Sequence, residues 1–457
     1  MNHDTPLNKE TPWAGELPHR SDGQGALAPM LLEAACPLAR VEKRAPGRPA
    51  TLSTLHLALA VLWGVLVGLR SQRAVWRLIC TRALGRFAPT SVCDQTVYDR
   101  LQDQGENSLR VLFEQVSGWL RNWLSVYQEW SLASFATEVY ILDESTLDSL
   151  GRWLKPLRAL EGKDLLAGRL CALFDVRRQL WVRLDVLTNA AANCKVHARA
   201  MLEGLPSGCL LLFDLGYFAF EWVDDLTRQG FWWVSRVRQH SSFTIQHVFV
   251  ETQDYREMLI QLGGYRTDWA AFTVRLIEFR YRGIWYSYMS NVLNPLVRSG
   301  CQIARLYARR WDIEMAFRVL KDYLGLRMLW SAKWPVIVAQ VWSCAILAQC
   351  LHALQVRLAA EVGVPTFDVS LEILLEQVDQ QVQAGLLFSS DVLTRFKEQG
   401  RHIGLVRPCS RIRIVVPEIC WTSYLWPPAD LVYERAPRYG HRPAGNWDRQ
   451  PPKACVT

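Results

Sequence analysis

The sequence lacks the patterns that mark several classes of protein. Its twelve cysteines are scattered along 457 residues and form no C-x-x-C pair, so neither a zinc ribbon nor a thioredoxin-type redox motif is indicated. The first residues, MNHDTPLNKETPWAGELPHR, lack the basic-then-apolar order of a signal peptide. We therefore expect a cytoplasmic protein whose thiols are reduced.

Uninterrupted apolar runs of membrane-spanning length are also absent. The two most hydrophobic runs are Leu57–Leu69 and Trp334–Val356. The first is too short to cross a bilayer, and the second carries Gln340, Gln349 and His352. Both runs predict buried helices, and no membrane partner is expected.

The excess of charge of one sign is small. Lys and Arg together number 52 and Asp and Glu 44, which gives a formal net charge of +8. This balance favours an anionic partner but does not identify nucleic acid, because it is a mild bias for so long a chain. Hydrophobic residues make up 50% of the chain and aromatic residues 11%, so a large folded core is expected.

Composition and periodicity divide the chain into five regions. The first and last are rich in Pro and polar residues and predict disorder. The second and fourth have helical periodicity, and the third changes to alternating apolar patterns. The predicted regions are a leader at 1–45, a helical region at 46–132, an α/β core at 133–330 with a β-rich insertion at about 225–295, a C-terminal helical region at 331–425, and a tail at 426–457.

Two stretches in or near the helical region have patterns found in DNA-binding proteins. Thr90–Leu101 has the polar start and apolar continuation of a helix that lies across DNA in a helix-turn-helix, although helical hairpins with no DNA role look the same. Lys43–Ala50 resembles part of a minor-groove hook, with Arg48 between a glycine and a proline. A solvated basic linker is the alternative explanation of the second stretch.

The core region places two aspartates at the ends of strands. It predicts strands at Glu138–Thr146, two strands within Leu170–Thr188, a helix at about 195–205 and a buried strand in Cys209–Phe218. Asp143 and Asp214 each follow an apolar run, at the C-terminal end where a carboxylate emerges from an open α/β sheet. If the two strands are adjacent, the two carboxylates lie together.

The stretch YARRWDIEMAFRVLKDYLGL, Tyr307–Leu326, combines many charges with helical periodicity. At about 100° per residue, its polar members fall within roughly 60° of one another. An adjacent stripe of apolar residues faces the core. The polar set is Tyr307, Arg310, Glu314 and Lys321. An ordinary surface helix whose charges align by chance is the alternative.

Three carboxylates from these segments make a candidate metal site. Glu314 on its helix would join Asp143 and Asp214 in an oxygen-only cluster suited to Mg²⁺ or Mn²⁺. Two such ions activate an attacking oxygen and stabilise a leaving oxygen in phosphoryl transfer. Three close carboxylates repel one another unless a cation is present, so the pattern indicates a site rather than a packing core.

The same residues resemble a known family. The spacing Tyr307-x2-Arg310-x3-Glu314-x6-Lys321 resembles the Y-R-E-K signature of bacterial insertion-sequence transposases of the insertion-sequence-four group, which belong to the DDE class. LDEST resembles that family's first-aspartate motif and FDLGYF its second. The resemblance covers roughly residues 138–326, in the family's order.

The resemblance implies a fold, an activity and partners. The fold is a ribonuclease-H-like α/β catalytic core with a β-rich insertion, preceded by a helical region that binds DNA ends. The activity is Mg²⁺-dependent cleavage and strand transfer, with Mn²⁺ as a substitute. The partners are double-stranded DNA, as terminal inverted repeats and as target, and a second copy of the chain in a synaptic homodimer. A bacterial, nucleoid-associated cytoplasmic location follows.

The resemblance also implies roles for single residues. Asp143, Asp214 and Glu314 would be catalytic and hold the metal. The phosphate-contacting residues would be Tyr307, Arg310 and Lys321, with Arg318 assisting, because a phenol, a guanidinium and an ammonium suit that task.

An aromatic residue of the insertion stacks on a flipped base in relatives, and either Trp232 or Trp233 would supply it here. A packing role is the alternative for either tryptophan. Arg236 and Arg238, which alternate on the same strand, would reach DNA phosphates unless they form a solvated strand face.

Two other functions are compatible with the same residues. One is a catalytically silent, DNA-binding descendant of a transposase, although intact acids at all three positions argue against it. The other is a ribonuclease-H-like metal nuclease that cuts DNA without joining it. Transfer of the 3′ ends to a target distinguishes that nuclease from a transposase.

Overall fold

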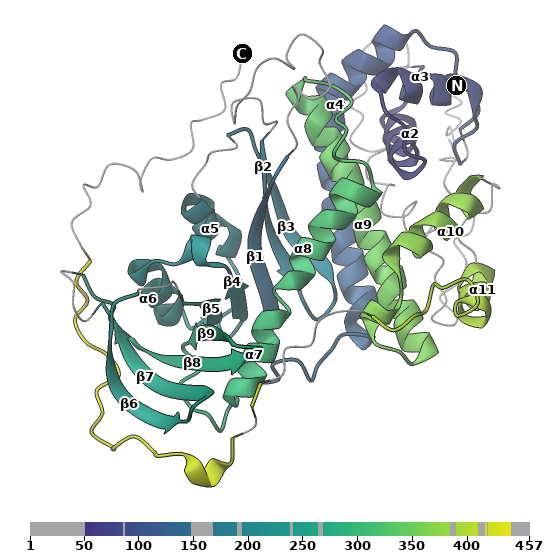
Figure 1. Ribbon diagram of the computed structural model, residues 1–457. Helices are drawn as coiled ribbons and strands as arrows, with labels where there is room; N and C mark the ends of the chain where they lie inside the picture. Colours follow the sequence, from purple (N-terminus) through teal and green to yellow (C-terminus); the bar gives the residue numbers. More distant parts are fainter. Residues whose placement is uncertain are drawn as a thin grey trace, which may run out of the picture.

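The computed structural model describes residues 51–439 except 86, 148–167, 190–193, 238–240, 264–267, 384–389, 410–415 and 418. The predicted leader at 1–45, the hook-like Arg48, Arg238 and the end of the tail at 440–457 lie outside the described residues. The rest is a mixed α/β structure built on one large sheet (Figure 1).

The described strands form a nine-stranded mixed sheet in the order β3-β2-β1-β4-β5-β9-β8-β7-β6. Strands β1, β4 and β5 are parallel, whereas β2 runs antiparallel to β1 and β3 antiparallel to β2. Strand β9 pairs antiparallel with β5 and joins the antiparallel meander β6–β9 to the sheet. The strands are β1 (Val139–Thr146), β2 (Arg169–Asp175), β3 (Leu180–Leu187), β4 (Leu210–Phe213), β5 (Trp232–Arg236), β6 (Phe243–Glu251), β7 (Tyr255–Leu262), β8 (Thr273–Tyr281) and β9 (Ile284–Ser290).

Helices cover both faces of the sheet, as Figure 1 shows. Alternate residues of β1 and β4 enter two different apolar clusters, one shared with α5 and α6 and the other with α4, α8 and α9. Because both faces are covered, β4 is apolar throughout and entirely buried. The helices are α2 (Thr54–Leu66), α3 (Gln72–Thr81), α4 (Asp94–Trp123), α5 (Cys194–Leu202), α6 (Phe220–Arg228), α7 (Gly300–Ala308), α8 (Trp311–Arg318), α9 (Trp334–Val362), α10 (Leu371–Gln383) and α11 (Ser390–Gln399).

Helix α9 is the central helix of the larger cluster. It packs against α4, α2 and β3, and among the described helices it is long and apolar enough to cross a membrane, although its most apolar part is entirely buried. Its polar side chains have specific partners. Gln349 accepts a hydrogen bond from the Trp181 backbone N–H (3.1 Å), and His352 Nδ1 lies 3.1 Å from the Gln179 carbonyl oxygen. These contacts fix the position of α9 along β3.

The charged stretch at Tyr307–Leu326 is not the one continuous helix that its periodicity predicts. Helix α7 ends at Ala308, α8 begins at Trp311, and a π-helical turn occupies Val319–Tyr323. The Asp312 N–H bonds the Arg309 carbonyl (2.8 Å) across the break. The π-turn adds a residue per turn, so the positions after Arg318 leave the face predicted for a regular helix.

The β-rich insertion also differs from the sequence interpretation. The strand β5, which the prediction placed inside the insertion, pairs in parallel with β4. The additional strands are β6–β9, and they extend the same sheet instead of forming a separate one. Local sequence patterns indicate that a segment is a strand, but they do not indicate its pairing partner.

Part of the predicted disordered tail is bonded to the sheet. Within residues 419–439 the Leu425 N–H bonds the Phe249 carbonyl (2.7 Å), and Tyr433 accepts from the Thr273 N–H (2.8 Å). The described residues 426–439 therefore follow the meander as an extended strap. Their Pro-rich composition is compatible with this conformation, because an irregular segment that pairs with strand ends needs no periodicity of its own.

Candidate active site

The site begins with the parallel pairing of β1 and β4. Leu142 lies opposite Phe213 in the register, so the next residues, Asp143 and Asp214, emerge side by side where β4 ends. Side chains alternate along a strand. Leu142 and Phe213 belong to the cluster on the α5–α6 face, so both aspartates face the opposite side, toward α8.

Glu314 comes from that side. Helix α8 packs against β1 and buries Ile313 and Phe317, which leaves Glu314 between core and solvent with its side chain 31% exposed. The electrostatic influence of both Glu314 and Asp214 on Asp143 places the three carboxylates in one local field.

Arg310 bridges two of these carboxylates. Its Nη1 donates to Asp143 Oδ2 at 3.0 Å, and its Nη2 donates to Glu314 one helical turn later. The Arg310 side chain is only 14% exposed, and its guanidinium lies 5.9 Å from the centre of the Tyr307 ring. The guanidinium therefore occupies the space between a strand carboxylate and a helix carboxylate.

Tyr307 contacts the third carboxylate. Its hydroxyl donates to Asp214 Oδ1 at 3.5 Å, a long hydrogen bond. Burial is the main cause that raises the pKa of Tyr307 above its ordinary value, so the phenol keeps its proton and remains a donor. Its ring packs against Tyr288 of β9, with centroids 4.9 Å apart.

The environment of Asp143 opposes its ionisation. Burial, the largest cause, raises the pKa of Asp143 to about 6, and the neighbouring Glu314 and Asp214 act in the same direction. The Glu144 backbone N–H (2.8 Å) and Arg310 partly offset this effect. A carboxyl group with such a raised pKa beside other carboxylates is typical of a functional site.

The second acid of the LDEST motif is held apart from this group. Glu144 points to the opposite face of β1, where it pairs with Arg169 Nη1 at 2.7 Å and accepts a hydrogen bond from Cys171 Sγ at 3.3 Å. The site therefore draws its acids from Asp143, Asp214 and Glu314.

The two other basic residues of the predicted set differ in position. Lys321 Nζ donates to the Thr146 carbonyl at 2.5 Å, which brings the π-turn against the end of β1. Arg318 pairs instead with Asp322 at 3.4 Å and has a side chain 56% exposed. The structure thus brings Lys321 to the strand that carries Asp143 and leaves Arg318 on the outer surface of α8.

The residues predicted on β5 also separate. Trp232 pairs with Leu210 at the start of β4, three residues before the site end of that strand, and its ring packs edge-on against Phe135. Trp233 is fully buried, with its indole N–H bonded to Thr227. Neither tryptophan lies with the carboxylates, and both make packing contacts.

Arg236, at the other end of β5, does border the site. It pairs in register with Tyr288, and its charge lowers the pKa of Tyr307 against the larger effect of burial. Tyr288 is not predictable as a site residue from the sequence, because its place beside Tyr307 depends on the β5–β9 pairing. The alternation in IWYSYMS is the sequence signal that was present.

A buried polar network positions α8. The Asp312 carboxylate accepts hydrogen bonds from Arg309 Nε (2.8 Å) and Gln179 Nε2 (2.9 Å), and the Asp312 side chain is fully buried. Gln179 lies in the β2–β3 turn with a positive φ of 57°. The start of α8, and with it Arg310 and Glu314, is thereby tied to the sheet.

The donor set is compatible with a hard divalent cation. Three carboxylates lie near the end of the β1–β4 pairing, and carboxylate oxygens are the ligands that Mg²⁺ or Mn²⁺ prefers. Over the described ranges, however, no group of three or more His, Cys, Asp or Glu residues is already spaced to hold a metal ion. Arg310 lies between Asp143 and Glu314 and pairs with both.

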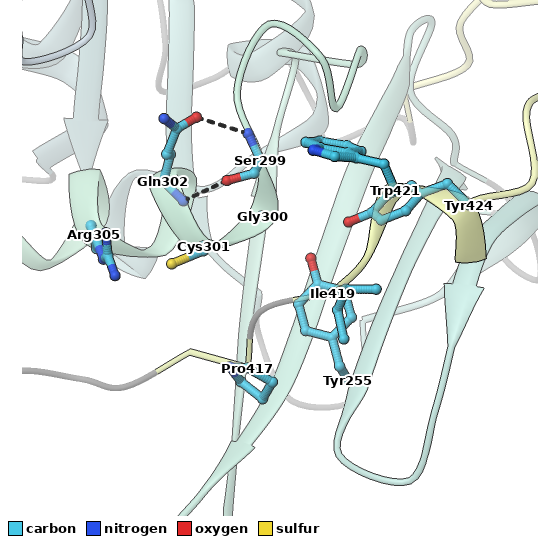
Figure 2. Close-up of a pocket in the computed structure, with 10 residues that line it drawn as sticks. All are labelled: Tyr255, Ser299, Gly300, Cys301, Gln302, Arg305, Pro417, Ile419, Trp421 and Tyr424. Atoms are coloured by element: carbon cyan, nitrogen blue, oxygen red, sulfur yellow. Dashed lines mark hydrogen bonds between the residues drawn. The ribbon is translucent and has the colours of Figure 1, made fainter.

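A separate hollow of about 290 Å³ opens at the other end of α7. Figure 2 shows the capping box at its wall, in which Ser299 Oγ accepts from the Gln302 N–H (3.3 Å) and Gln302 Oε1 accepts from the Ser299 N–H (3.0 Å). Trp421 and Tyr424, which precede the strap in the chain, form another wall. No acidic residue is among the described residues that line it, so it is distinct from the carboxylate site.

Comparison with known proteins relates the site to one family. Residues 137–350, a little under half of the chain, match the family model described as Transposase DDE domain, and this segment contains all three carboxylates. The piggyBac transposase in a synaptic complex with hairpin DNA, solved by cryo-EM, is 10% identical with a TM-score of 0.38 over 84% of this chain and 83% of that chain. A TM-score this low does not establish a common fold. No curated protein sequence matches the chain.

Proposed function

We propose that the chain is a DDE transposase, which cuts DNA at the ends of a mobile element and joins the freed ends to target DNA. One observation carries the proposal. Carboxylates from β1, β4 and α8 converge on one face of the sheet, inside the segment that matches a Transposase DDE domain. Asp143 and Asp214 both follow the last residues paired between β1 and β4, and the carboxyl end of a parallel pairing is the usual place of a site in an α/β sheet.

The catalytic core of this proposal is ribonuclease-H-like. The strand order β3-β2-β1-β4-β5 supports that assignment. Of the two strands beside β1, β2 is antiparallel to it and β4 is parallel to it. The meander β6–β9 is the inserted part, and the helical segment before residue 133 is the region proposed to bind DNA ends. Double-stranded DNA, as terminal inverted repeats and as target, and a second copy of the chain in a synaptic homodimer are the proposed partners, in a bacterial cytoplasm at the nucleoid.

Each residue of the site has a proposed task. Asp143, Asp214 and Glu314 hold Mg²⁺ or Mn²⁺, which when bound supplies Lewis-acid activation of the attacking and leaving oxygens. Tyr307, whose raised pKa keeps its hydroxyl protonated, donates to a phosphate oxygen. Arg310 binds phosphate through its planar guanidinium, which matches two oxygens at once.

The remaining basic residues have secondary tasks in this proposal. Lys321 supplies an ammonium beside the end of β1. Arg236 lines the rim next to Tyr307, where it meets the DNA backbone. Arg318 is exposed on α8 and adds positive charge on the approach to the site. Positive charge around a cleft speeds the encounter with DNA and makes it sensitive to salt.

Cleavage of duplex DNA that carries the element's own ends tests the proposal. We expect nicking that exposes a 3′-hydroxyl in Mg²⁺ or Mn²⁺, followed by joining of that end to a target plasmid. Glu314→Gln should bind the same duplex and fail to cut it, because the change removes the charge that holds the metal. Glu144→Gln is the matched control, since Glu144 is the neighbouring acid on the opposite face of β1.

The outcomes separate the three candidate functions. Binding without cutting in any divalent metal would favour a silent DNA-binding protein. Cutting without joined products would favour a nuclease. Equal loss of cleavage in Glu314→Gln and Glu144→Gln would show that the face of β1 does not distinguish catalytic acids from structural ones, and the proposed site would be rejected.

A further inference from the structure

Two residues near the break between α7 and α8 engage all three carboxylates of the site. Arg310 donates hydrogen bonds to Asp143 and Glu314, and Tyr307 donates one to Asp214. The three acids, which come from two strands and a helix, are thus arranged around a guanidinium and a phenol.

The guanidinium of Arg310 supplies the positive charge that a metal ion would supply at this site. Three carboxylates in one partly buried field repel one another, and Arg310 supplies a positive charge between Asp143 and Glu314. Its side chain is 14% exposed, between partners that are 17% and 31% exposed. At this level of burial an ion pair is less screened by water and salt than a surface pair.

Two of the five N–H donors of Arg310 are used at the site, one on each terminal nitrogen. Nη1 is used by Asp143 and Nη2 by Glu314. A phosphodiester gripped by two parallel N–H···O bonds needs neighbouring donors of the same planar fork. A phosphodiester bound end-on by Nη1 and Nη2 therefore competes with both carboxylates for Arg310.

Resting on the transposase function proposed above, we propose that Arg310 is an interlock between DNA and metal. Without DNA, its guanidinium closes the carboxylate site against divalent cations. When a DNA phosphate takes the guanidinium, Asp143 and Glu314 are released to bind the cation. The partner that opens the site is therefore a phosphodiester, and loading of the metal is confined to complexes with DNA.

Thermodynamic linkage makes this interlock measurable. If DNA strengthens metal binding by some factor, the metal strengthens DNA binding by the same factor. Removing Arg310 should abolish the coupling between DNA binding and metal binding, with two measurable effects. The protein without DNA gains metal affinity, and added DNA increases that affinity little further. Damage to the fold would lower metal affinity, so a gain cannot come from misfolding.

Mn²⁺ binding to the full chain, followed by the EPR signal of the free ion, tests the inference. The titrations compare the unaltered protein, Arg310→Ala and Arg305→Ala, each with and without a duplex carrying the element's end. The duplex alone and Asp143→Asn with duplex supply the background of Mn²⁺ bound to DNA. Arg305 is a matched control because it is an exposed arginine of the adjoining helix α7 and lies outside the carboxylate group.

We expect Arg310→Ala to bind Mn²⁺ without DNA roughly tenfold more tightly than the unaltered protein, a size typical of coupling between sites. The unaltered protein should gain a similar factor when the duplex is added, and Arg305→Ala should behave like it. Arg310→Gln, which keeps hydrogen-bond donors but lacks the charge, gives the same comparison if Arg310→Ala does not fold.

Each contrary outcome has a definite meaning. Equal Mn²⁺ affinity of Arg310→Ala and the unaltered protein without DNA overturns the interlock, as does a duplex effect of the same size in both. If the unaltered protein still cuts DNA in Mn²⁺, only the interlock has failed. If neither protein binds Mn²⁺ and the unaltered protein does not cut, the transposase function fails together with the interlock.

Discussion

Replacing Asp143 by asparagine should make the protein more stable at pH 8 in the absence of divalent metal. The pKa of the buried Asp143 carboxyl is raised from 3.8 to about 6. A tenfold change in an acid dissociation constant corresponds to about 1.4 kcal/mol, so the ionised carboxylate costs the fold about 3 kcal/mol. The Asp143 side chain is 17% exposed, which leaves little solvent screening to reduce this value.

The pH window follows from the direction in which burial moves this pKa. The folded protein binds the Asp143 proton more tightly than the unfolded chain does, so ionisation costs nothing below pH 3.8, progressively more between 3.8 and 6, and its full amount above pH 6. Asparagine carries no charge at any pH. The gain of Asp143→Asn should therefore approach about 3 kcal/mol at pH 8 and vanish near pH 4.

Urea unfolding followed by tryptophan fluorescence, with EDTA present, measures the gain. The two pH values are compared for the unaltered protein, Asp143→Asn and Glu144→Gln. The control Glu144→Gln removes the neighbouring acid, whose pair with Arg169 (2.7 Å) is favourable, so it should give no gain at pH 8. If Asp143→Asn is no more stable than the unaltered protein at pH 8, burial does not strain this carboxylate and the reasoning is refuted.

Three further predictions concern the scaffold. Burial lowers the pKa of His352 from 6.5 to about 4, so the folded protein favours the neutral imidazole. The resulting contribution to the free energy of unfolding is complete above pH 6.5, and about 3 kcal/mol of it is lost as the pH falls to 4. His352→Gln should reduce that acid sensitivity in urea unfolding between pH 7 and 4, and an unchanged pH dependence would contradict it. Gly300→Ala should destabilise the protein by roughly 1–3 kcal/mol, because the added Cβ overlaps the Tyr255 hydroxyl. The control Gly118→Ala, in open space on α4, should be neutral or slightly stabilising. Equal effects of the two changes in thermal unfolding would refute the packing argument. Asp312→Asn should cost roughly 1–3 kcal/mol, because it removes the buried charge that accepts hydrogen bonds from the partly exposed Arg309. It should lower the rate of DNA cleavage more than the affinity for DNA; the reverse pattern would show that the network does not position α8.

The aspartates of the site follow from local sequence patterns. An apolar run that ends in an acid indicates a buried strand with a carboxylate at its end, and the parallel pairing of β1 with β4 puts Asp143 beside Asp214. The helical spacing around Glu314 likewise survives in α8, because Arg310 and Glu314 are one regular turn apart. These features depend on short-range periodicity, which a sequence displays directly.

Other parts of the site depend on contacts between distant segments. Tyr288 reaches Tyr307 only because β9 pairs with β5, and Trp232 is directed away from the carboxylates by its register with β4. Pairing partners and registers are decided by packing of the whole sheet. For the same reason, the bridge that Arg310 makes between Asp143 and Glu314 could not be read from their spacing in the chain.

Helix α9 is synthesised after several of the segments against which it packs. Helices α4 and α2 and strand β3, against which α9 packs, all precede Trp334 in the chain. The segments that form this part of the surface around α9 are therefore synthesised before the apolar helix, whereas α10 and α11, which also contact it, are synthesised after it. Helix α9 can pack against its earlier partners as soon as it emerges, which shortens the time during which other hydrophobic surfaces in the cell can capture it. A chain that stopped before residue 334 would instead display the surface of these earlier partners to solvent.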